Sequence, residues 1–384
     1  MTEPKKIVLL GATGSIGEST LKVLRKHSDR LQLVGISAHT NGQKLANIAR
    51  EFKVPYAYLA PSAGRAEGFP SSTNLDRSTD GLVSMASLPE ADLVVIAVVG
   101  SSGLSPTLAS LEAGKDIVLA NKESLVLGGH LVMQTATQNK VRVIPADSEH
   151  NAVFQCLQGE NHRDLDSIIL TASGGPFREF PLDELRNVTV QQALNHPNWS
   201  MGNKVTIDSA TMANKGLELI EAHWLFGLNP KKLEVVIHPS SIVHAIVRFV
   251  DGCCLAQLSP PSMTFALQHA LLFPDRAEGV NTSLDFSNPL DLQFKPPSME
   301  RFPCLRLAKD SLIHGGSAPL VFNAANEVAV ESFLLNRIGF LQISGIIEQT
   351  LSKFDHQTKN DLQTLLYLDS EARRIASQLI GPNS

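Results

Sequence analysis

An apolar strand, a glycine-rich turn and a helix open the chain, and they restrict its fold more than any other feature. Ile7-Val8-Leu9-Leu10 leads into Gly11-Ala-Thr-Gly-Ser-Ile-Gly17, and a helical pattern runs from about Glu18 to Lys26. Glycines at such positions let the backbone approach a pyrophosphate at the N-terminus of the helix. The spacing is Gly-x-x-Gly-x-x-Gly, so a tight turn of an ordinary α/β protein is the alternative. We predict a dinucleotide-binding βαβ unit.

Four further apolar strands are predicted in the first 150 residues, separated by stretches compatible with helices: Leu31–Ile36, Leu93–Val99, Ile117–Ala120 and Val141–Ile144. Near-continuous apolar strands that alternate with helices indicate a parallel sheet covered on both faces. Ligands of such sheets bind at the carboxyl ends of the strands. We therefore expect a Rossmann-like, doubly wound domain over residues 1–150.

The end of the strand Leu31–Ile36 indicates which nicotinamide cofactor is bound. An NAD enzyme normally offers a carboxylate there to the ribose 2′-hydroxyl, whereas this chain has Ser37-Ala38-His39-Thr40-Asn41. The sequence therefore predicts NADPH. Its 2′-phosphate could meet His39, Thr40, Asn41 or the more distant Lys44.

Polar residues follow two of the strands at the expected binding edge. Asn121-Lys122-Glu123 follows one, and Asp147-Ser148-Glu149-His150 follows the next. An Asp-x-Glu pair suits a hard divalent cation such as Mg²⁺ or Mn²⁺. The same tripeptide is common in solvated turns and helix caps, and its position at the strand end favours the metal.

The segment Lys204–Trp224 combines a candidate anion site with a candidate metal ligand. Val205 and Ile207 alternate as in a strand, and Asp208 or Ser209 is expected to cap a following helix. Helical spacing then places three polar side chains on one face, namely Asn214, Lys215 and Glu218. A helix N-terminus with a hydroxyl and a lysine favours a phosphate. An ordinary amphipathic surface helix is the alternative.

The part of the chain after residue 150 is organised differently. We expect a central α+β domain over residues 151–285, a proline-rich linker over 286–305 and a C-terminal α-helical domain over 306–384. The central domain contains Ala172-Ser173-Gly-Gly175, a second candidate phosphate turn, and a hairpin around Asp251-Gly252. In that hairpin, Cys253 and Cys254 are expected to be buried small hydrophobic residues.

Composition excludes several classes of function. The 384 residues include 33 basic and 38 acidic side chains, so a net charge of −5 does not favour nucleic acid as a partner. No apolar run has the length of a membrane span, and Met1-Thr-Glu-Pro-Lys-Lys6 leads straight into a strand. We expect a cytoplasmic protein without a membrane partner.

Seven motifs in order closely resemble the 1-deoxy-D-xylulose 5-phosphate reductoisomerase family between about Lys5 and Glu331. They are Gly-Ala-Thr-Gly-Ser-Ile-Gly, Ala-Asn-Lys-Glu-Ser, Asp-Ser-Glu-His, Thr-Ala-Ser-Gly-Gly-Pro-Phe, His-Pro-Asn-Trp-Ser-Met-Gly, Asp-Ser-Ala-Thr-Met-x-Asn-Lys-Gly-Leu-Glu and Ala-Ala-Asn-Glu-Val-Ala-Val. The resemblance implies a homodimeric enzyme of isoprenoid precursor biosynthesis by the non-mevalonate pathway. Such an enzyme uses NADPH and one divalent cation, Mn²⁺ or Mg²⁺ with Co²⁺ also possible, to convert a small sugar phosphate into 2-C-methyl-D-erythritol 4-phosphate.

The resemblance also implies the roles of individual residues. The metal ligands are Asp147, Glu149 and Glu218, and the catalytic residues are Lys122, Glu149, His196 and Glu218. The substrate-binding residues are Lys122, Ser148, Glu149, Ser173, His196, Trp199, Ser209, Asn214, Lys215, Glu218 and His244. The cofactor-binding residues are Gly11, Thr13, Gly14, Ser15, Ile16, Ala38, His39, Asn41, Asn121, Glu123, Gly202 and Met263. Met201 is expected with His196 and Trp199 on a mobile loop over the substrate.

Two alternatives remain at this point. An enzyme like aspartate-semialdehyde dehydrogenase begins with the same turn and uses NADP, but it needs an activated cysteine, and Cys156 in Ala-Val-Phe-Gln-Cys-Leu has an apolar setting. A non-catalytic NADP sensor would retain the sheet and the turn. Such a sensor has no use for three carboxylates and a phosphate site.

Overall fold

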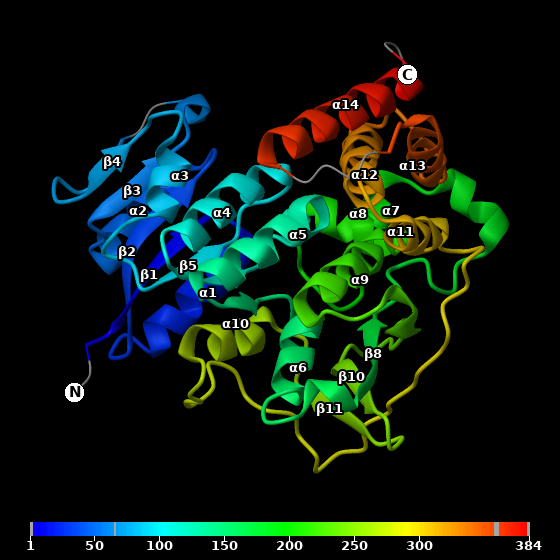
Figure 1. Cartoon of the computed structure of the whole chain (residues 1–384), viewed down its shortest axis with the longest axis horizontal. Helices are drawn as coiled ribbons and strands as arrows, with labels where there is room; N and C mark the ends of the chain where they lie inside the picture. The colour runs from blue at the N-terminus through cyan, green and yellow to red at the C-terminus, as the bar shows by residue number, and fades with distance from the viewer. Residues whose placement is uncertain (1–2, 65–66, 357–360, 382–384) are drawn as a thin grey trace. The chain divides into compact units, whose positions relative to one another are not determined.

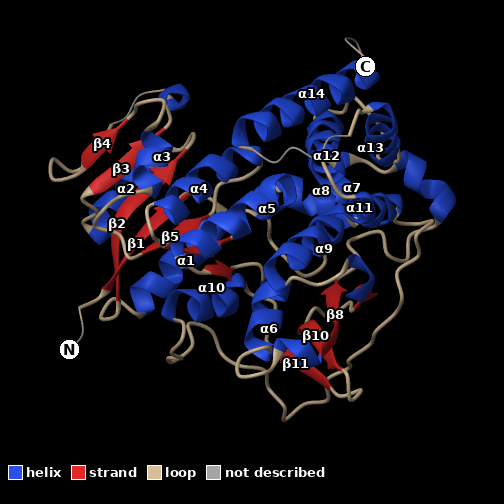
Figure 2. Cartoon of the chain, in the orientation of Figure 1, coloured by secondary structure: helices blue, strands red, loops and turns tan. Residues whose placement is uncertain are grey.

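The computed structural model describes residues 3–64, 67–356 and 361–381, and the chain divides into two compact units. The first unit comprises Met1–Ser124, Val132–Asn151 and Met263–Thr282, and the second comprises Leu125–Leu131, Ala152–Ser262 and Ser283–Ser384. Figure 1 follows the chain by colour, and Figure 2 distinguishes its strands from its helices. Met1 and Thr2, at the start on which the expected cytoplasmic location partly depends, lie outside the described residues.

The two units differ from the four expected segments chiefly in that residues 263–282 are grouped with most of residues 1–150. The chain also passes from one unit to the other within α5 (Lys122–Asn139) and α6 (Ser148–Cys156). Grouping by compactness does not test which segments fold as domains. The expected four-segment division therefore stays a prediction.

The first unit contains a seven-stranded, fully parallel sheet in the order β4-β3-β2-β1-β5-β6-β7. The strands are β1 (Lys5–Leu10), β2 (Leu31–Ala38), β3 (Tyr56–Leu59), β4 (Asn74–Asp76), β5 (Leu93–Ile96), β6 (Asp116–Leu119) and β7 (Val143–Pro145). The order reverses at β1, which lies between β2 and β5. This reversal creates the switch point at which doubly wound sheets bind ligands, so the predicted α/β class is confirmed.

Helices connect these parallel strands because a parallel pair needs a long crossover. They are α1 (Ser15–Lys26), α2 (Gly42–Phe52), α3 (Gly81–Ala86), α4 (Leu104–Glu112) and α5, of which Leu125–Leu131 is grouped with the second unit. The centre of the sheet is buried on both faces, and Ile7, Val8, Leu9 and Leu10 of β1 have no exposed surface. That burial explains why the strand is apolar throughout instead of alternating.

Helix α10 (Met263–Leu272) belongs to the first unit although it follows the second in sequence. Lys5 donates a hydrogen bond to the carbonyl of Leu271 at 3.0 Å, and Arg30 forms an ion pair of 2.6 Å with Asp275. Helices α10 and α1 also pack against each other. These contacts attach Met263, a predicted cofactor contact, to the unit that contains the glycine-rich turn.

The second unit contains a four-stranded mixed sheet in the order β11-β10-β8-β9. Its strands are β8 (Leu165–Ala172), β9 (Leu233–Ile237), β10 (Val243–Phe249) and β11 (Cys254–Leu258). Strands β10 and β11 form the antiparallel hairpin predicted from Asp251-Gly252, and β8 pairs with β9 in parallel. Cys253 and Cys254 are exposed, because β11 is an edge strand; the prediction that they are buried was wrong.

Most of the second unit is helical. Its helices are α7 (Val190–Ala193), α8 (Asn203–Thr211), α9 (Ala213–Phe226), α11 (Pro303–His314), α12 (Ala318–Leu334), α13 (Gln342–Lys353) and α14 (Leu362–Ile380). They enclose one apolar core that includes Leu217 of α9 and Phe322 of α12. Gly216 permits the close packing of α9 on α11, because an added Cβ would lie 2.4 Å from the Cβ of Ala308. In the part of the chain that is described, no helix is both long and apolar enough to cross a membrane.

The predicted strand at Val205 and Ile207 was wrong, because these residues lie in α8. Two alternating positions fit either period, and the helix places Ile207 in the core. The expected caps were wrong as well. Met212, in the left-handed region with φ of 60°, precedes α9, and Asp208 lies inside α8. The break at Met212 turns one predicted helix into two that share the polar residues of the motif.

Candidate active site

The glycine-rich turn of the first unit is built for close backbone approach. Gly11 has φ of +86°, and a Cβ there would lie 2.4 Å from the carbonyl oxygen of Ala97. A Cβ on Gly17 would lie equally close to the carbonyl of Ala12. Helix α1 begins after Gly14 without a side-chain cap. Its first N–H groups are therefore available to an anion such as a pyrophosphate.

The end of β2 is tied to this turn. The N–H of Gly11 donates to the Ser37 hydroxyl at 3.0 Å, and Asn41 caps α2 by accepting from the N–H of Lys44. Lys44 itself forms an ion pair of 2.6 Å with Glu18 and donates to the Thr13 carbonyl at 2.9 Å. The eight predicted cofactor residues between Gly11 and Asn41 thus lie on one βαβ element. Lys44 lies beside the turn, where its charge can support an anionic cofactor.

Asn121 has its side chain committed to the protein. Its Nδ2 donates to the carbonyls of Val98 and Gly100 at 3.1 and 3.0 Å, while its Oδ1 accepts from the Ser124 N–H at the start of α5. The side chain is fully buried. Asn121 therefore joins the end of β5 to α5 and fixes the next two residues, Lys122 and Glu123.

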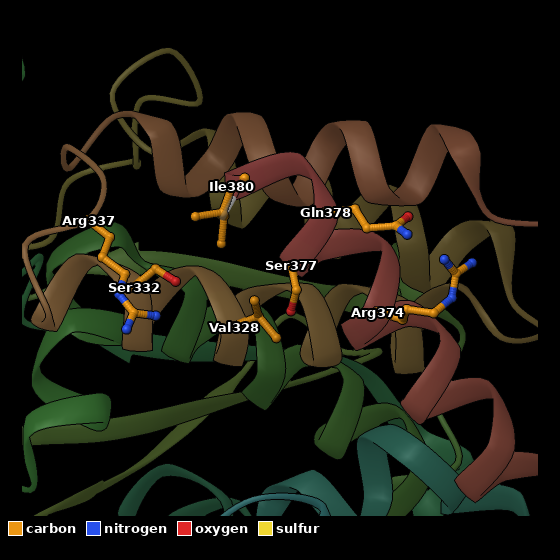
Figure 3. A pocket seen from close by; sticks show the side chains of 8 residues that line it. Val328, Ser332, Arg337, Arg374, Ser377, Gln378 and Ile380 are labelled. Atoms are coloured by element: carbon orange, nitrogen blue, oxygen red, sulfur yellow. The ribbon is translucent and has the colours of Figure 1, made fainter. Parts of the chain in front are cut away.

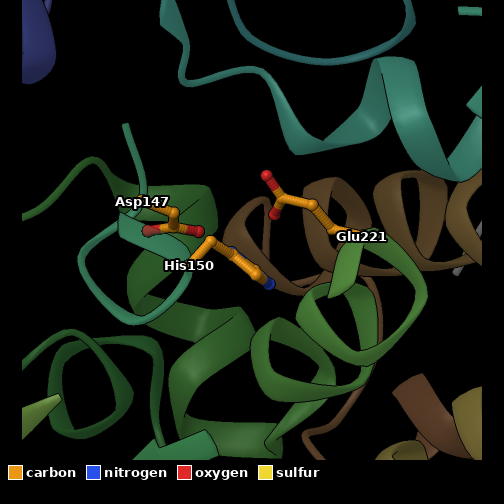
Figure 4. A group of neighbouring side chains, drawn as sticks. All are labelled: Asp147, His150 and Glu221. Atoms are coloured by element: carbon orange, nitrogen blue, oxygen red, sulfur yellow. The ribbon is translucent and has the colours of Figure 1, made fainter. Parts of the chain in front are cut away.

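Asp147 and Glu149 follow β7, as predicted. Carboxylate oxygens of these two residues lie within 4.8 Å of each other, a spacing that one cation can bridge. The Ser148 hydroxyl donates to Glu149 at 2.6 Å, and Lys122 forms an ion pair of 2.5 Å with Asp147. Figure 4 shows the side chains of Asp147 and His150 next to each other in this unit.

Three residues that are far apart in sequence meet in the second unit. Nε2 of His196 lies 3.0 Å from the Ser173 hydroxyl and 3.1 Å from the Ser209 hydroxyl. We call Ser173, His196 and Ser209 the serine–histidine cluster. The turn at Gly174 and Gly175, both with positive φ, permits this arrangement, because a Cβ on Gly175 would lie 2.8 Å from the Ser209 carbonyl oxygen.

His196 is neutral, and its hydrogen bonds determine its tautomer. Burial, assisted by the positive charge of Arg178, lowers the pKa of His196 to about 4. Nδ1 accepts from the backbone N–H groups of Asn198 and Trp199 at 3.2 and 2.9 Å, so the proton lies on Nε2. The Ser173 oxygen also accepts from the N–H of Gly175 at 3.1 Å. With its oxygen accepting, the Ser173 hydroxyl can donate to an anionic oxygen.

Helix α9 contributes the cationic part of the site. Asn214 donates to Glu218 at 2.5 Å, and Lys215 forms an ion pair with the same carboxylate. Lys215 and Glu218 are both buried. The predicted grouping of Asn214, Lys215 and Glu218 on one face is confirmed.

The loop that contains His196 is irregular and is anchored to β10 and its preceding turn. Nδ2 of Asn198 donates to the Pro239 carbonyl and the Ser241 hydroxyl, and the Trp199 ring lies edge-on to His244 with centroids 6.3 Å apart. His244 is buried and bonded to Ser259. Sequence reasoning missed Asn198 and Ser241. The adjacent serines after His238-Pro239 carry only a weak turn signal, although Ser241 has φ of 54°.

Cys156, Cys253 and Cys304 do not have the lowered pKa of an activated nucleophile. Burial raises the pKa of the Cys156 thiol to about 11 and that of Cys304 to about 12. Hydrogen bonding to Asp251 raises the pKa of Cys253. Thiolate is the reactive form, so this chemistry disfavours the enzyme class that acts through a cysteine.

The second unit also contains a cavity of about 610 Å³ between the C-terminal parts of α12 and α14 (Figure 3). It is lined by Val328, Ser332, Arg337, Arg374, Ser377, Gln378, Ile380 and Gly381. None of the predicted site residues lines it. The serine–histidine cluster and the polar residues of α9 are therefore not part of this cavity.

Comparison with known proteins finds one family over most of the chain. Family models match residues 7–129 (1-deoxy-D-xylulose 5-phosphate reductoisomerase), 143–226 (its C-terminal domain) and 258–375 (DXP reductoisomerase C-terminal domain). The 1-deoxy-D-xylulose 5-phosphate reductoisomerase of Clostridium kluyveri is 46% identical over 376 residues, covering 96% of this chain and 98% of the relative.

Solved structures are similar over nearly the full length. The Zymomonas mobilis reductoisomerase in complex with NADPH is 42% identical with a TM-score of 0.90, covering 99% of this chain and 100% of that one. A DOX-P reductoisomerase in complex with NADPH, fosmidomycin and magnesium is 39% identical with a TM-score of 0.91, covering 98% of both chains.

Proposed function

The chain belongs to the 1-deoxy-D-xylulose 5-phosphate reductoisomerase family, and we propose that it carries out the family's reaction with the residues described above. With NADPH and a divalent cation, it rearranges the carbon skeleton of 1-deoxy-D-xylulose 5-phosphate and reduces the resulting aldehyde to 2-C-methyl-D-erythritol 4-phosphate. NADPH and magnesium are bound by the DOX-P reductoisomerase cited above.

The observation that carries the proposal is the serine–histidine cluster. Ser173 and Ser209 both lie within hydrogen-bond distance of a neutral His196, so their hydroxyls are held where an anion can accept from them. With Asn214 and Lys215 of the same unit they form a phosphate site made of hydroxyl, amide and ammonium donors. The phosphate does not react, and its binding energy positions the carbon atoms that do.

Three carboxylates suit the cation. Asp147, Glu149 and Glu218 would hold it with Ser148 beside them, since hard oxygen ligands are those that Mg²⁺ and Mn²⁺ prefer. When bound, the ion supplies Lewis-acid polarisation of the substrate carbonyl and stabilises the charge on its oxygen. Glu149 accepts a hydrogen bond from Ser148, which orients the carboxylate before it binds.

The remaining residues orient the reactants and exclude water. The turn between Gly11 and Ile16, with Ala38, His39 and Asn41, binds the dinucleotide, and Gly202 and Met263 contact it further along. Lys122 and Glu123, fixed by Asn121, contact the reacting carbons and the nicotinamide. His196, Trp199 and Met201 cover the substrate, and His244 supports the Trp199 ring.

Assembly and location complete the proposal. We propose a homodimer that uses the second unit, because β11 is an edge strand with the exposed apolar side chain of Leu255. We also propose a cytoplasmic location, since the exposed adjacent thiols of Cys253 and Cys254 suit a reducing compartment.

The test is NADPH oxidation, followed by absorbance, with 1-deoxy-D-xylulose 5-phosphate as substrate. Turnover should require Mg²⁺ or Mn²⁺, stop with a chelator, and survive alkylation of the exposed cysteines. The product should be identified as 2-C-methyl-D-erythritol 4-phosphate. Turnover that persists in chelator, or that alkylation abolishes in a folded protein, contradicts the proposal.

A further inference from the structure

Glu218, proposed above as a metal ligand, is engaged by two residues proposed to bind phosphate. Lys215 forms an ion pair with its carboxylate, and Asn214 donates to it. All three residues lie on consecutive turns of α9, so the contacts are built into one helix. The side chains of Lys215 and Glu218 are 4% and 1% exposed, so water screens their attraction weakly.

A carboxylate and a phosphate place the same demand on these donors. Each is an anion that accepts charge-assisted hydrogen bonds from an ammonium and an amide. A donor that points at Glu218 must turn away from it, or be shared, to bind a phosphate. Glu218 therefore opposes phosphate binding as long as its negative charge is uncompensated.

A cation bound to Glu218 changes this balance. It compensates the carboxylate charge and occupies lone pairs that Lys215 and Asn214 otherwise use. Lys215 is buried, and a buried ammonium requires an anionic or hydrogen-bonding partner. A phosphate can then serve as an anionic partner of the Lys215 ammonium.

The first unit repeats the pattern. Lys122, proposed to contact the reacting carbons, forms an ion pair of 2.5 Å with Asp147, another proposed metal ligand. In each unit, therefore, a lysine assigned to substrate is held by a carboxylate assigned to metal. The repetition argues that the pairing is a property of the site and not of one helix.

We propose that Glu218 is an internal competitor of the substrate phosphate for Lys215 and Asn214, and that a divalent cation removes this competition. The inference rests on the proposed function, because that function makes Glu218 a metal ligand. The phosphate site then becomes strong only in protein that carries the cation. Sugar phosphates are thereby kept from occupying protein that cannot process them.

Thermodynamic reciprocity makes the proposal quantitative. If the cation tightens phosphate binding by some factor, phosphate must tighten cation binding by the same factor. Couplings of this kind are commonly between about fivefold and 150-fold, and we expect about tenfold. Direct attraction between cation and phosphate also contributes, so variants must separate the two causes.

The experiment measures binding of inorganic phosphate to the full chain by calorimetry, with and without Mg²⁺ and without NADPH. Wild-type protein should bind phosphate about tenfold more tightly with Mg²⁺. Glu218→Gln should bind phosphate more tightly than wild type when Mg²⁺ is absent, and Mg²⁺ should have no further effect on this variant. Glu149→Gln should bind phosphate weakly in both conditions, because it loses the cation but keeps the competitor. Equal phosphate affinities of Glu218→Gln and wild type without Mg²⁺ overturn the proposal.

A second measurement covers the case in which Glu218→Gln does not fold. Lys215→Met should bind Mg²⁺ several-fold more tightly than wild type, because the carboxylate no longer has its lysine, and phosphate should tighten Mg²⁺ binding less than it does in wild type. Lys204→Met is the matched control: it removes the pair of Lys204 with Asp208 in the same unit and should leave Mg²⁺ affinity unchanged. Unaltered Mg²⁺ affinity in Lys215→Met overturns the competition. If wild-type protein does not bind Mg²⁺, the proposed metal site itself is wrong.

Discussion

The glycine-rich turn of the first unit and the serine–histidine cluster of the second are both suited to phosphate groups, but they are built from different parts of the chain. The turn offers backbone N–H groups at the start of α1 and needs the absence of side chains at Gly11 and Gly17. The cluster offers hydroxyl and imidazole groups from the turn after β8, from the loop around His196 and from α8.

This difference decides how each site can be damaged. A backbone site fails when an added atom blocks the close approach, whereas a side-chain site fails when a donor or its charge is altered. It also decides how each site is tuned, because side-chain donors can be held by internal partners such as Glu218.

Glu218→Gln should cause the largest effect. The amide keeps the shape but loses the charge that a cation requires, so turnover should fall by at least about a thousandfold, since the ion supplies several kcal/mol of stabilisation to the transition state. NADPH affinity, measured by fluorescence titration, should remain within about twofold of wild type, because the turn lies in the other unit. Substantial turnover in this variant removes Glu218 from the metal site.

Gly11→Ala should damage the glycine-rich turn by adding an atom, whereas Glu218→Gln acts by removing a charge. The added Cβ would lie 2.4 Å from the Ala97 carbonyl oxygen, and the alanine would have to keep the positive φ of Gly11. We therefore expect about a hundredfold loss of NADPH affinity or a loss of stability of a few kcal/mol.

Gly114→Ala is the matched control for Gly11→Ala. Gly114 has φ of +70° with nothing within 4 Å of an added Cβ, so it carries the same conformational cost without the collision. NADPH affinity of this variant should match wild type. Equal losses in the two variants would show that backbone strain, and not close approach, controls the turn.

The contrast between the sites also explains what sequence reasoning could predict. The turn, β1 and α1 are local, so glycine spacing and an apolar run predicted them. The grouping of Asn214, Lys215 and Glu218 was predictable for the same reason, since one helical period defines it. Both features depend on residues close together in the chain.

Features that depend on distant residues were missed. The hydrogen bonds that join His196 to Ser173 and Ser209 follow from the positive φ of Gly174 and Gly175 and from packing against α8. Asp208 was expected to cap a helix, but Asn326 of α12 donates to it at 2.7 Å and Lys204 pairs with it. When the hydrogen-bond partner of a carboxylate lies more than a hundred residues away, the sequence around the carboxylate does not reveal it.

The cofactor preference offers a smaller test within the first unit. The end of β2 has no carboxylate, so Ala38→Asp or His39→Asp should repel the 2′-phosphate and accept the 2′-hydroxyl of NADH instead. We expect the ratio of kcat/KM for NADPH over NADH to fall about tenfold or more. Ala38→Asn is the neutral control. A wild-type preference for NADH would show that this strand end was misread.

Two histidines, the half-buried His196 and the buried His269, allow the pH stability of the units to be compared. His196 in the second unit and His269 in the first both have pKa values lowered to about 4, mainly by burial. The unfolded chain binds more protons below its ordinary histidine pKa of about 6.5. Each residue therefore contributes stability that is fully present above about pH 6.5 and is lost as the pH falls towards 4.

Replacing either histidine should reduce this acid sensitivity. Between pH 7 and pH 4.5 the free energy of unfolding falls in wild type. In His196→Gln this fall should be smaller by only about 1 to 2 kcal/mol, because the ring is partly exposed to solvent. His269→Gln should show a similar reduction. Urea unfolding at both pH values measures this, and an acid sensitivity equal to wild type in both variants would show that these rings do not control it.

The loop from Asn195 to Asn203 gives the smallest but most specific signal. It contains turn-forming residues, His196 and Trp199, and it is attached to the region of β10 through Asn198 and through the ring contact of Trp199 with His244. We expect it to tighten on a ligand that has metal-chelating oxygens and a phosphate-like group, since closure buries the Trp199 ring and brings His196 to the substrate.

To measure the closure by tryptophan fluorescence, Trp224 must first be replaced by Phe, so that the signal comes from Trp199. Its ring packs on Gly129 and beside His223, so the smaller ring should be accommodated. Ligand should then change Trp199 fluorescence by some tens of per cent and slow proteolysis in the loop. If neither observable responds, and the free loop already resists the protease, it is a rigid element and its covering role is wrong.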